Sequence, residues 1–318
     1  MCTCVTLKTE DFYFGRNLDL EYHYNESVVI TPRNFLFRFS DCHYGFIGIA
    51  TLYDNYPLYY DGTNEKGLSV AGLNFPENAF YGESIPDKIN LAPFEFIPWL
   101  LSSFDSVENA LPSLEKLNLI DTPFSEKFPN SPLHWMISDK HKCVTLEPTK
   151  SGVKIYENPI GVLTNNPTFD IQMFNLNNYA SLTNSAPDTF FAGKFPINQY
   201  SQGLGGLGLP GDLSSMSRFV RAAFTKLNSV CGISEEESVS QFFHILSSVA
   251  HARGTVKVGD KDEITIYSSC CNADKGIYYY TTYENQRISC VDMFKENLNS
   301  SRIMSYPIID KQDFLRQN

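Results

Sequence analysis

The chain begins with Met1 and Cys2, which can bring a nucleophilic sulfur and a terminal amine together. Methionine is commonly removed when the next residue is small, and the mature chain would then begin at Cys2. A thiol with an ordinary pKa of about 8.5 and an α-amine with one of about 7.7–8.0 would share that residue, so the amine can accept the thiol proton near neutrality. One residue then supplies both nucleophile and base. The alternative is a small cysteine buried in a strand, which the dipeptide alone does not exclude.

A cation and a carboxylate follow in the segment 14–19, which reads FGRNLD. Near Cys2, the Arg16 guanidinium would favour the thiolate over the thiol. The Asp19 carboxylate, three residues later, could orient the α-ammonium. The plainer interpretation is a surface Arg/Asp pair, which is common and contributes little to stability.

Short strands must position these residues, because the N-terminal third consists of short runs of β-branched and aromatic residues that turn residues separate. We expect strands at 2–7, 12–14, 27–31, 35–39, 45–52 and 68–74. A buried helical stretch is expected at 94–101. The next helix has Ser106 as its N-cap and should kink or break at Pro112.

The rest of the chain alternates further strands with two amphipathic helices. Apolar residues recur at helical spacing around Phe219 and around Phe242. Strands are expected at 133–139, 143–147, 153–156, 161–163, 263–269, 276–282 and 286–292, the last three joined as hairpins. Strands, then helices, then strands again predict an α+β fold with antiparallel sheets covered by helices. Residues 184–212 lack periodicity, and so long a connection is usually functional or used in assembly.

Composition narrows the class of protein. A chain of 318 residues buries about three quarters of its unfolded surface, so it needs neither disulfides nor a metal to fold. With 42% hydrophobic and 19% charged residues it is globular, and a net charge of −11 repels phosphate backbones, so nucleic acid is not expected as a partner. The eight cysteines contain no CxxC pair and the six histidines no HExxH. We therefore expect no metal and no cofactor.

The N-terminus lacks a signal-peptide pattern, and no apolar run is long enough for a membrane span. We expect a cytoplasmic protein with reduced thiols and no membrane insertion. The glycines at 203–208 match GxGxxG, but the preceding residues make a poor strand and no βαβ pattern surrounds them. We interpret them as a flexible glycine loop.

Several strings along nearly the whole chain resemble the choloylglycine hydrolase family, and within it the bile salt hydrolases. They are MCT at 1–3, FGRNLD at 14–19, ITPRNF at 30–35, NEKGL at 64–68, AGLNFP at 71–76, SPLHWMISD at 131–139, GVLTNNPTFD at 161–170, GLPGDLSSMSRF at 208–219 and KGIYYYTTYEN at 275–285. So many strings in the same order make a chance match negligible. The resemblance implies an N-terminal nucleophile hydrolase with a four-layer αββα sandwich, formed by one domain over 1–318 (mature chain 2–318).

The resemblance also implies roles for particular residues. Cys2 would be the nucleophile and its amine the base, with Arg16 tuning the thiol and Asp19 holding the amine. Asn165 would donate a side-chain N–H to the oxyanion, and Asn74 would complete that hole. Such donors are each worth about 10²–10³ in rate.

Two further residues belong to this expectation. Arg218 would join the charged cluster around the nucleophile. Cys4 departs from the family, which more often has a small residue other than cysteine there. In a strand it shares a face with Cys2, and we interpret it as a buried small residue.

Three functions are consistent with the sequence. The first is hydrolysis of glycine- or taurine-conjugated bile salts, and the second is penicillin V acylase chemistry with the same nucleophile. The third is a silent binding protein that keeps the fold for its pocket. Bile salt hydrolases tend to carry Asn at the position of Asn74, where penicillin V acylases of the family often carry Tyr, so the first is favoured. Apolar walls could come from the early aromatic residues Tyr22, Tyr24, Phe46, Tyr56 and Tyr59, some of which could equally be core. The resemblance implies a homo-oligomer, commonly a tetramer, gripped by the loop around 184–212.

Overall fold

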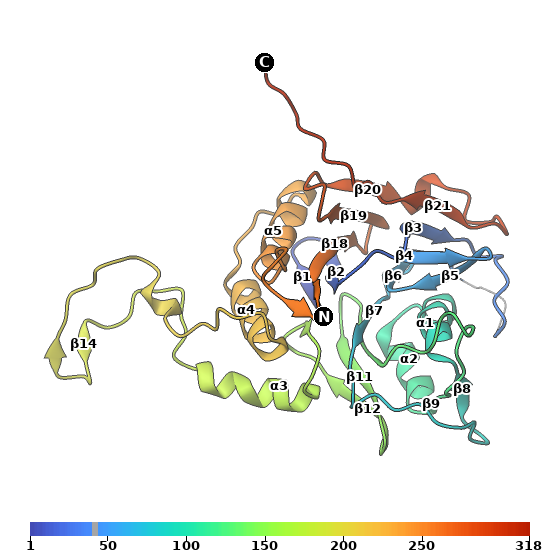
Figure 1. Cartoon of the computed structure of the whole chain (residues 1–318), viewed down its shortest axis with the longest axis horizontal. Helices are drawn as coiled ribbons and strands as arrows, with labels where there is room; N and C mark the ends of the chain where they lie inside the picture. Colours follow the sequence, from blue (N-terminus) through green and yellow to red (C-terminus); the bar gives the residue numbers. More distant parts are fainter. Residues whose placement is uncertain (40–43) are drawn as a thin grey trace.

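Two antiparallel sheets lie face to face at the centre of the computed structural model, and helices cover the outer face of each (Figure 1). The structure describes residues 1–39 and 44–318, so Cys42 and His43 lie outside the described residues. The expected α+β class and its four αββα layers are confirmed. Within the described ranges, no helix has the length and apolar character needed to cross a membrane.

The first sheet carries the N-terminus on an inner strand. Its order is β13-β1-β2-β18-β19-β20, with every neighbouring pair antiparallel. The strands are β1 Cys2–Lys8, β2 Phe12–Leu20, β13 Val162–Leu163, β18 Ile264–Asn272, β19 Ile277–Thr282 and β20 Ser289–Asp292. Six of the seven residues of β1 are buried, because β1 has a strand on each side and is covered on both faces.

The second sheet faces the first across the middle of the molecule. Its order is β12-β11-β10-β7-β6-β4-β3-β21, and β5 pairs with β4. The strands are β3 Glu26–Thr31, β4 Phe46–Tyr53, β5 Tyr56–Tyr59, β6 Asp61–Asn64, β7 Ser69–Asn74, β10 Leu133–Ser138, β11 Cys143–Thr149, β12 Gly152–Glu157 and β21 Met304–Pro307. Short two-stranded pairs lie outside these sheets: β8 Ile89–Leu91 with β9 Leu117–Leu119, β14 Phe190–Phe191 with β15 Phe195–Pro196, and β16 Lys257–Val258 with β17 Lys261–Asp262.

Different helices cover the two sheets. Helices α4 (Ser215–Asn228) and α5 (Glu235–Ser247) pack on the first sheet, whereas α1 (Phe96–Ser103) and α2 (Val107–Leu114) pack on the second (Figure 1). Helix α3 spans Phe169–Asn175, and 3₁₀ turns lie at Pro93–Glu95, Leu176–Tyr179, Leu204–Gly206 and Met293–Lys295. One apolar core joins both sheets to α4 and α5, and a second lies between the second sheet and α1 and α2. The hydrophobic effect therefore fixes all four layers.

Two local features differ from the expectation of a strand at 35–39 and of a break at Pro112. Residues 35–39 form an irregular segment with one isolated bridge residue, Leu36, rather than a regular strand, because the rings of Phe35, Phe37 and Phe39 pack on one another with centroids 4.8 and 5.1 Å apart and join the second core. Helix α2 begins after the Ser106 cap as expected but continues through Pro112 to Leu114. The carbonyl of Glu108, which Pro112 leaves without its helical partner, belongs to an exposed residue and can be hydrated.

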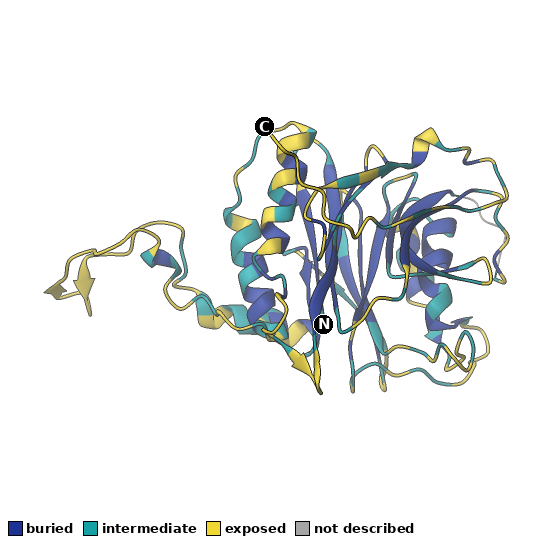
Figure 2. Cartoon of the chain, turned by 45° about the horizontal axis from the view of Figure 1, so that its top comes forward, coloured by how far each residue is buried: buried dark blue, intermediate teal, exposed yellow. Residues whose placement is uncertain are grey.

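The segment 184–212 extends away from the layers as an exposed arm ending in the β14–β15 hairpin (Figures 1 and 2). Its aromatic residues are solvent-exposed, including Phe191 at 70% and Tyr200 at 82%. The glycines at 203–208 lie at the base of this arm around the turn Leu204–Gly206, with no strand leading directly into them.

Candidate active site

The pairing of β1 with β2 brings Arg16 close to Cys2. In this register Cys2 faces Leu18 and Cys4 faces Arg16 on the partner strand. Residues two apart on a strand share a face, so Cys2, Cys4 and Arg16 project to the same side. That side faces the second sheet, since Arg16 Nη1 donates to the carbonyl oxygens of Tyr60, at 3.1 Å, and Gly72.

Glycine at position 15 permits this arrangement. A Cβ on Gly15 would lie 2.0 Å from the carbonyl oxygen of Ser269 in β18. The segment FGRNLD therefore needs glycine before Arg16, because any side chain would push β18 away from β2.

Arg16 is buried as a charged group between the sheets, with 1% of its surface exposed. Its Nη2 has no hydrogen-bond partner among residues 1–39 and 44–318. Burial alone would lower the pKa of Arg16, but the charges of Cys2, Tyr267 and Asp61 raise it above its ordinary value. The guanidinium therefore stays charged between the sheets, on the same face of the strand pair as Cys2.

Asn165 contacts the N-terminal segment directly. Its side-chain Oδ1 accepts from the backbone N–H of Cys2 at 2.9 Å and from Arg218 Nη2 at 2.7 Å. Its Nδ2 donates to the carbonyl oxygen of Asn74 at 2.7 Å. An amide Nδ2 carries two hydrogens, so one remains to donate to a substrate oxygen.

Arg218 approaches Cys2 from helix α4, on the other side of β1. Its Nη1 donates to the Cys2 carbonyl and, at 2.6 Å, to the Thr3 hydroxyl. The guanidinium is fully buried, and its Nη1 lies 4.0 Å from Asp19 Oδ2. One cation therefore ties together α4, the N-terminal strand, Asn165 and Asp19.

The Asp19 carboxylate lies in this cluster but does not contact the Met1 amine. Its Oδ1 accepts from the Thr265 hydroxyl at 2.6 Å. With Met1 present, the terminal ammonium instead contacts the main-chain oxygen of Asp19 at 2.6 Å and Glu263 Oε2 at 2.8 Å. His251 Nδ1 lies 3.0 Å from the other Glu263 oxygen.

Sequence reasoning missed Glu263 and His251. Burial alone would raise the pKa of Glu263, but the hydrogen bond from His251 and the terminal ammonium lower it below its ordinary value. The signal was the pairing of β18 with β2, where Thr265 faces Asp19 and so brings Glu263 to the N-terminus. That pairing joins segments about 250 residues apart, which no local pattern reveals.

Asn74 is the last residue of β7, and its side chain is exposed. Its main-chain oxygen, rather than its side chain, contacts Asn165. An exposed amide at the end of a strand beside the Asn165 contact can reach a ligand that approaches from solvent.

Cys4 and Cys270 are buried thiols. Cys4 is fully buried, and burial raises the pKa of its thiol well above the ordinary value, as it does for Cys270. These cysteines are therefore held as neutral thiols. This agrees with the interpretation of Cys4 as a buried small residue.

The aromatic residues expected as pocket walls divide into two groups. Phe46, Tyr56 and Tyr59 pack in the second core. Tyr22 and Tyr24 follow β2 near the surface, with ring centroids 4.8 Å apart and hydroxyls 2.8 Å apart. Of the five residues, only Tyr22 is exposed, at 47% of its surface.

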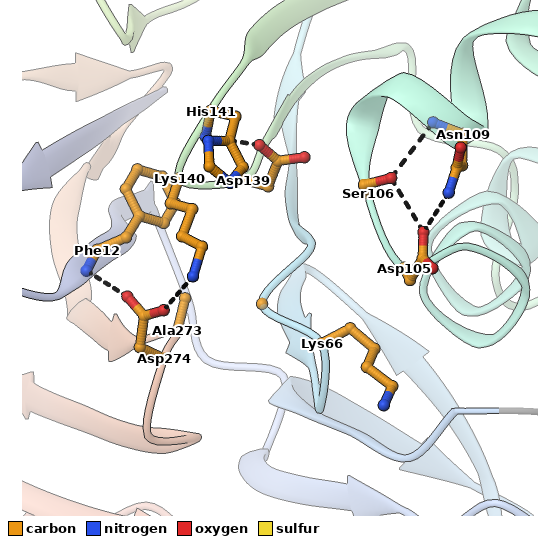
Figure 3. A pocket seen from close by; sticks show the side chains of 11 residues that line it. Phe12, Lys66, Asp105, Ser106, Asn109, Asp139, Lys140, His141, Ala273 and Asp274 are labelled. Atoms are coloured by element: carbon orange, nitrogen blue, oxygen red, sulfur yellow. Dashed lines mark hydrogen bonds and ion pairs between the residues drawn. The ribbon is translucent and has the colours of Figure 1, made fainter.

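A cavity of about 320 Å³ lies at the opposite end of β1 and β2 from Cys2 (Figure 3). It is lined by Phe12, Lys66, Gly67, Asp105, Ser106, Asn109, Asp139, Lys140, His141, Ala273 and Asp274. Phe12 pairs with Lys8, six residues along β1 from Cys2, which corresponds to about 20 Å. Within the cavity lining, Lys140 pairs with Asp274 at 3.2 Å. In the described part of the chain, no cluster of three or more His, Cys, Asp or Glu residues is arranged to hold a metal.

Comparison with known proteins gives a consistent result. A family model for linear amide C–N hydrolases of the choloylglycine hydrolase family matches residues 2–306. The chain is 53% identical to a bile salt hydrolase/transferase of Lactiplantibacillus plantarum, with both chains fully covered. It is 43% identical to a protein of the same name from Clostridium perfringens, over 96% of each.

Solved structures agree with these relatives. The C2A mutant of a conjugated bile acid hydrolase from Clostridium perfringens has a TM-score of 0.94 and 40% identity, with full coverage of both chains. A penicillin V acylase from Agrobacterium tumefaciens has a TM-score of 0.73 and 21% identity over 96% of this chain and 90% of its own. The second likeness concerns the fold alone.

Proposed function

This chain belongs to the choloylglycine hydrolase family of linear amide C–N hydrolases, and we propose that it hydrolyses the amide bond of glycine- or taurine-conjugated bile salts. The observation that carries the proposal is the contact of Asn165 with the Cys2 backbone N–H at 2.9 Å. It joins the expected nucleophile to the expected oxyanion donor.

Chemistry begins once Met1 has been removed. The Cys2 sulfur attacks the amide carbonyl carbon, and the thiol proton passes to the α-amine. Arg16, buried on the same face of the sheet, favours the thiolate that attacks. Arg218 holds the Cys2 carbonyl and Asn165 together during this step.

The tetrahedral intermediate carries a negative oxygen. The free Nδ2 hydrogen of Asn165 donates to it, and the Asn74 amide completes the hole. When the C–N bond breaks, the α-ammonium gives its proton to the leaving glycine or taurine nitrogen. An acyl-thioester on Cys2 remains.

Water completes the cycle. The α-amine accepts a proton from the attacking water, and the same donors bind the second oxyanion. The C–S bond then breaks, the proton returns to the Cys2 sulfur, and the bile acid leaves. Asp19, beside Arg218 and Thr265, supports this cluster through its charge.

The acyl group is the point on which a second candidate function differs. A penicillin V acylase would use the same Cys2 chemistry on a smaller acyl group. The bile salt assignment is supported by the full-length relatives and by Asn74, a residue smaller than the Tyr expected in penicillin acylases. A fused-ring acyl group needs a broad apolar wall, for which Tyr22 and Tyr24 are available.

A kinetic panel tests this assignment. Purified protein, shown by intact mass to begin at Cys2, is given glycine conjugates, taurine conjugates and penicillin V under the same conditions. We expect kcat/KM for the conjugated bile salts to exceed that for penicillin V well beyond tenfold. A higher kcat/KM for penicillin V would change the assignment to a penicillin V acylase. Binding of these compounds without turnover of any amide would favour a binding protein.

We also propose that residues 1–318 act as one domain and that the exposed arm at 184–212 assembles the chain into a homo-oligomer, with a tetramer as the expected form. Arm aromatics such as Phe191 and Tyr200 expose apolar area that association would bury. A cytoplasmic location is part of the proposal, supported by the free state of the cysteines in the described ranges.

A further inference from the structure

His134, in the middle of the molecule, is a fully buried histidine that the reaction above does not use. It belongs to β10, and both of its ring nitrogens are engaged. Nε2 lies 2.9 Å from the carbonyl oxygen of Thr164, and Nδ1 lies 3.2 Å from Glu147 Oε1. Its ring stacks on Phe75 with centroids 4.2 Å apart and planes 7° apart.

The partners of His134 determine where its hydrogens are. A carbonyl oxygen only accepts, so Nε2 carries the hydrogen in the contact with Thr164. Glu147 Oε1 also accepts from the Phe169 backbone N–H at 2.9 Å. With Glu147 on one side of the ring and Thr164 on the other, the orientation of the ring is fixed from both sides.

These contacts connect His134 to both segments that carry the proposed oxyanion donors. Thr164 immediately precedes Asn165, and Phe75 immediately follows Asn74. Through Glu147, the same pair holds Phe169, where α3 begins after the Asn165 loop. One buried ring thus sets the spacing between two backbone segments that meet at the Asn165–Asn74 hydrogen bond.

We propose that His134 is a positioning residue for the oxyanion hole, acting on Asn165 through Thr164 and on Asn74 through Phe75. The inference rests on the proposed function, because it assumes that these two residues bind the oxyanion. Loss of the Nε2 contact moves Asn165 relative to the substrate carbonyl. A misplacement of about 1 Å lowers the rate by as much as about 10²-fold.

Two substitutions of His134 separate positioning from general packing. In His134→Gln, the side-chain amide nitrogen reaches the position of Nε2 and keeps the donor to Thr164. In His134→Asn, the shorter amide reaches only the position of Nδ1 and loses that donor. We expect His134→Asn to lower kcat by about 10-fold to 10²-fold with little change in KM, and His134→Gln to stay within a few-fold of wild type.

The rate at which iodoacetamide alkylates Cys2 distinguishes positioning from general damage to the site, because general damage would change that rate. Alkylation needs the thiolate but no oxyanion hole, so its rate should be the same in both variants and wild type. A wild-type kcat for His134→Asn would overturn the proposal. Equal losses of kcat in both variants, with alkylation slowed in parallel, would also overturn it, since that pattern indicates damage to the whole site.

The variant Asn165→Ala shows whether a failed prediction concerns His134 or the proposed function itself. If Asn165→Ala keeps a wild-type kcat, the proposed hole itself is wrong. If Asn165→Ala is impaired and His134→Asn is not, only the role of His134 fails. Combined with Asn165→Ala, His134→Asn should lower kcat much less than it does alone, because its effect passes through Asn165.

A second variant covers the case in which His134→Asn does not fold. Phe75→Leu removes the stacked ring on the Asn74 side and keeps an apolar side chain. We expect a several-fold lower kcat with unchanged Cys2 alkylation, and an unchanged kcat would contradict the proposal.

Discussion

Replacing Asn165 removes the residue whose contacts connect the nucleophile, the cation of α4 and the end of β7. Its Oδ1 accepts from Cys2 and Arg218, and its Nδ2 donates to Asn74. Asn165→Ala deletes all three contacts and the free hydrogen proposed for the oxyanion. Asn165→Asp keeps the acceptor for Cys2 and Arg218 but has no donor. The two variants therefore separate the catalytic donor from the structural acceptor.

The size of each effect follows from these contacts. Loss of one oxyanion donor lowers kcat by about 10²–10³, equal to about 2.7–4 kcal/mol of transition-state stabilisation. In Asn165→Ala, the buried Arg218 Nη2 also loses its acceptor, which lowers the free energy of unfolding by about 1–3 kcal/mol. Asn165→Asp should lose at least as much kcat. Its carboxylate still accepts from Arg218, so its loss of stability comes from the second carboxylate oxygen, which replaces Nδ2 beside the Asn74 carbonyl oxygen.

Three measurements distinguish these outcomes. Release of glycine from a glycine conjugate gives kcat and KM, urea unfolding gives the free energy of unfolding, and iodoacetamide gives the reactivity of Cys2. We expect KM to change less than kcat, since the donor acts mainly in the transition state. A kcat for Asn165→Asp within a few-fold of wild type would refute the reasoning, because that variant has no side-chain donor.

Other variants test the remaining parts of the account. Cys2→Ala should abolish turnover and leave the fold intact, and full turnover by this variant would contradict the assignment of the nucleophile. Cys2→Ser should retain only a small residual rate, because an alkoxide forms far less readily than a thiolate. Arg16→Gln should slow the alkylation of Cys2 at neutral pH but not that of the exposed Cys290, followed by peptide mapping, and equal rates at Cys2 in the two proteins would show that Arg16 does not favour the thiolate. Residues 190–196 can be replaced by two glycines, because the ends of this segment lie close together, with the Ile197 N–H donating to the Thr189 carbonyl oxygen at 2.8 Å. Light scattering should then show a smaller assembly, and an unchanged mass would exclude the arm from assembly. Hydrogen bonds from Ser214 and Ser217 lower the pKa of Asp212 to about 2, so its contribution to stability should be present above its ordinary pKa and be lost as pH falls towards 2. In Asp212→Asn, the free energy of unfolding measured in urea should therefore fall less steeply over this acid range than in wild type, and an equal fall would contradict that contribution.

Much of the fold was predictable because its signals are local. The runs of β-branched and aromatic residues expected as strands at 2–7 and 133–139 form β1 and β10, and the apolar spacing around Phe219 and Phe242 gives α4 and α5. Local signals failed where tertiary packing decides. The three rings at 35–39 have strand propensity, but they pack on one another in an irregular segment.

The site was predictable to the extent that its residues lie in recognisable strings. Cys2, Arg16 and Asn165 could be named in this way. Glu263 and His251 could not, because they reach the N-terminus only through the pairing of β18 with β2. The sequence also could not distinguish the buried Phe46 from the exposed Tyr22, because an aromatic residue gives the same signal in a core and at a pocket wall.

Detection of the acyl-enzyme tests the central claim most directly. The enzyme is mixed with a glycine-conjugated bile salt, quenched in acid within one turnover, digested and analysed by mass spectrometry. The account predicts a bile-acyl mass on the N-terminal peptide, as a thioester on Cys2 with Met1 absent. The acyl mass on another residue such as Cys4, or full turnover by protein that retains Met1, would contradict it.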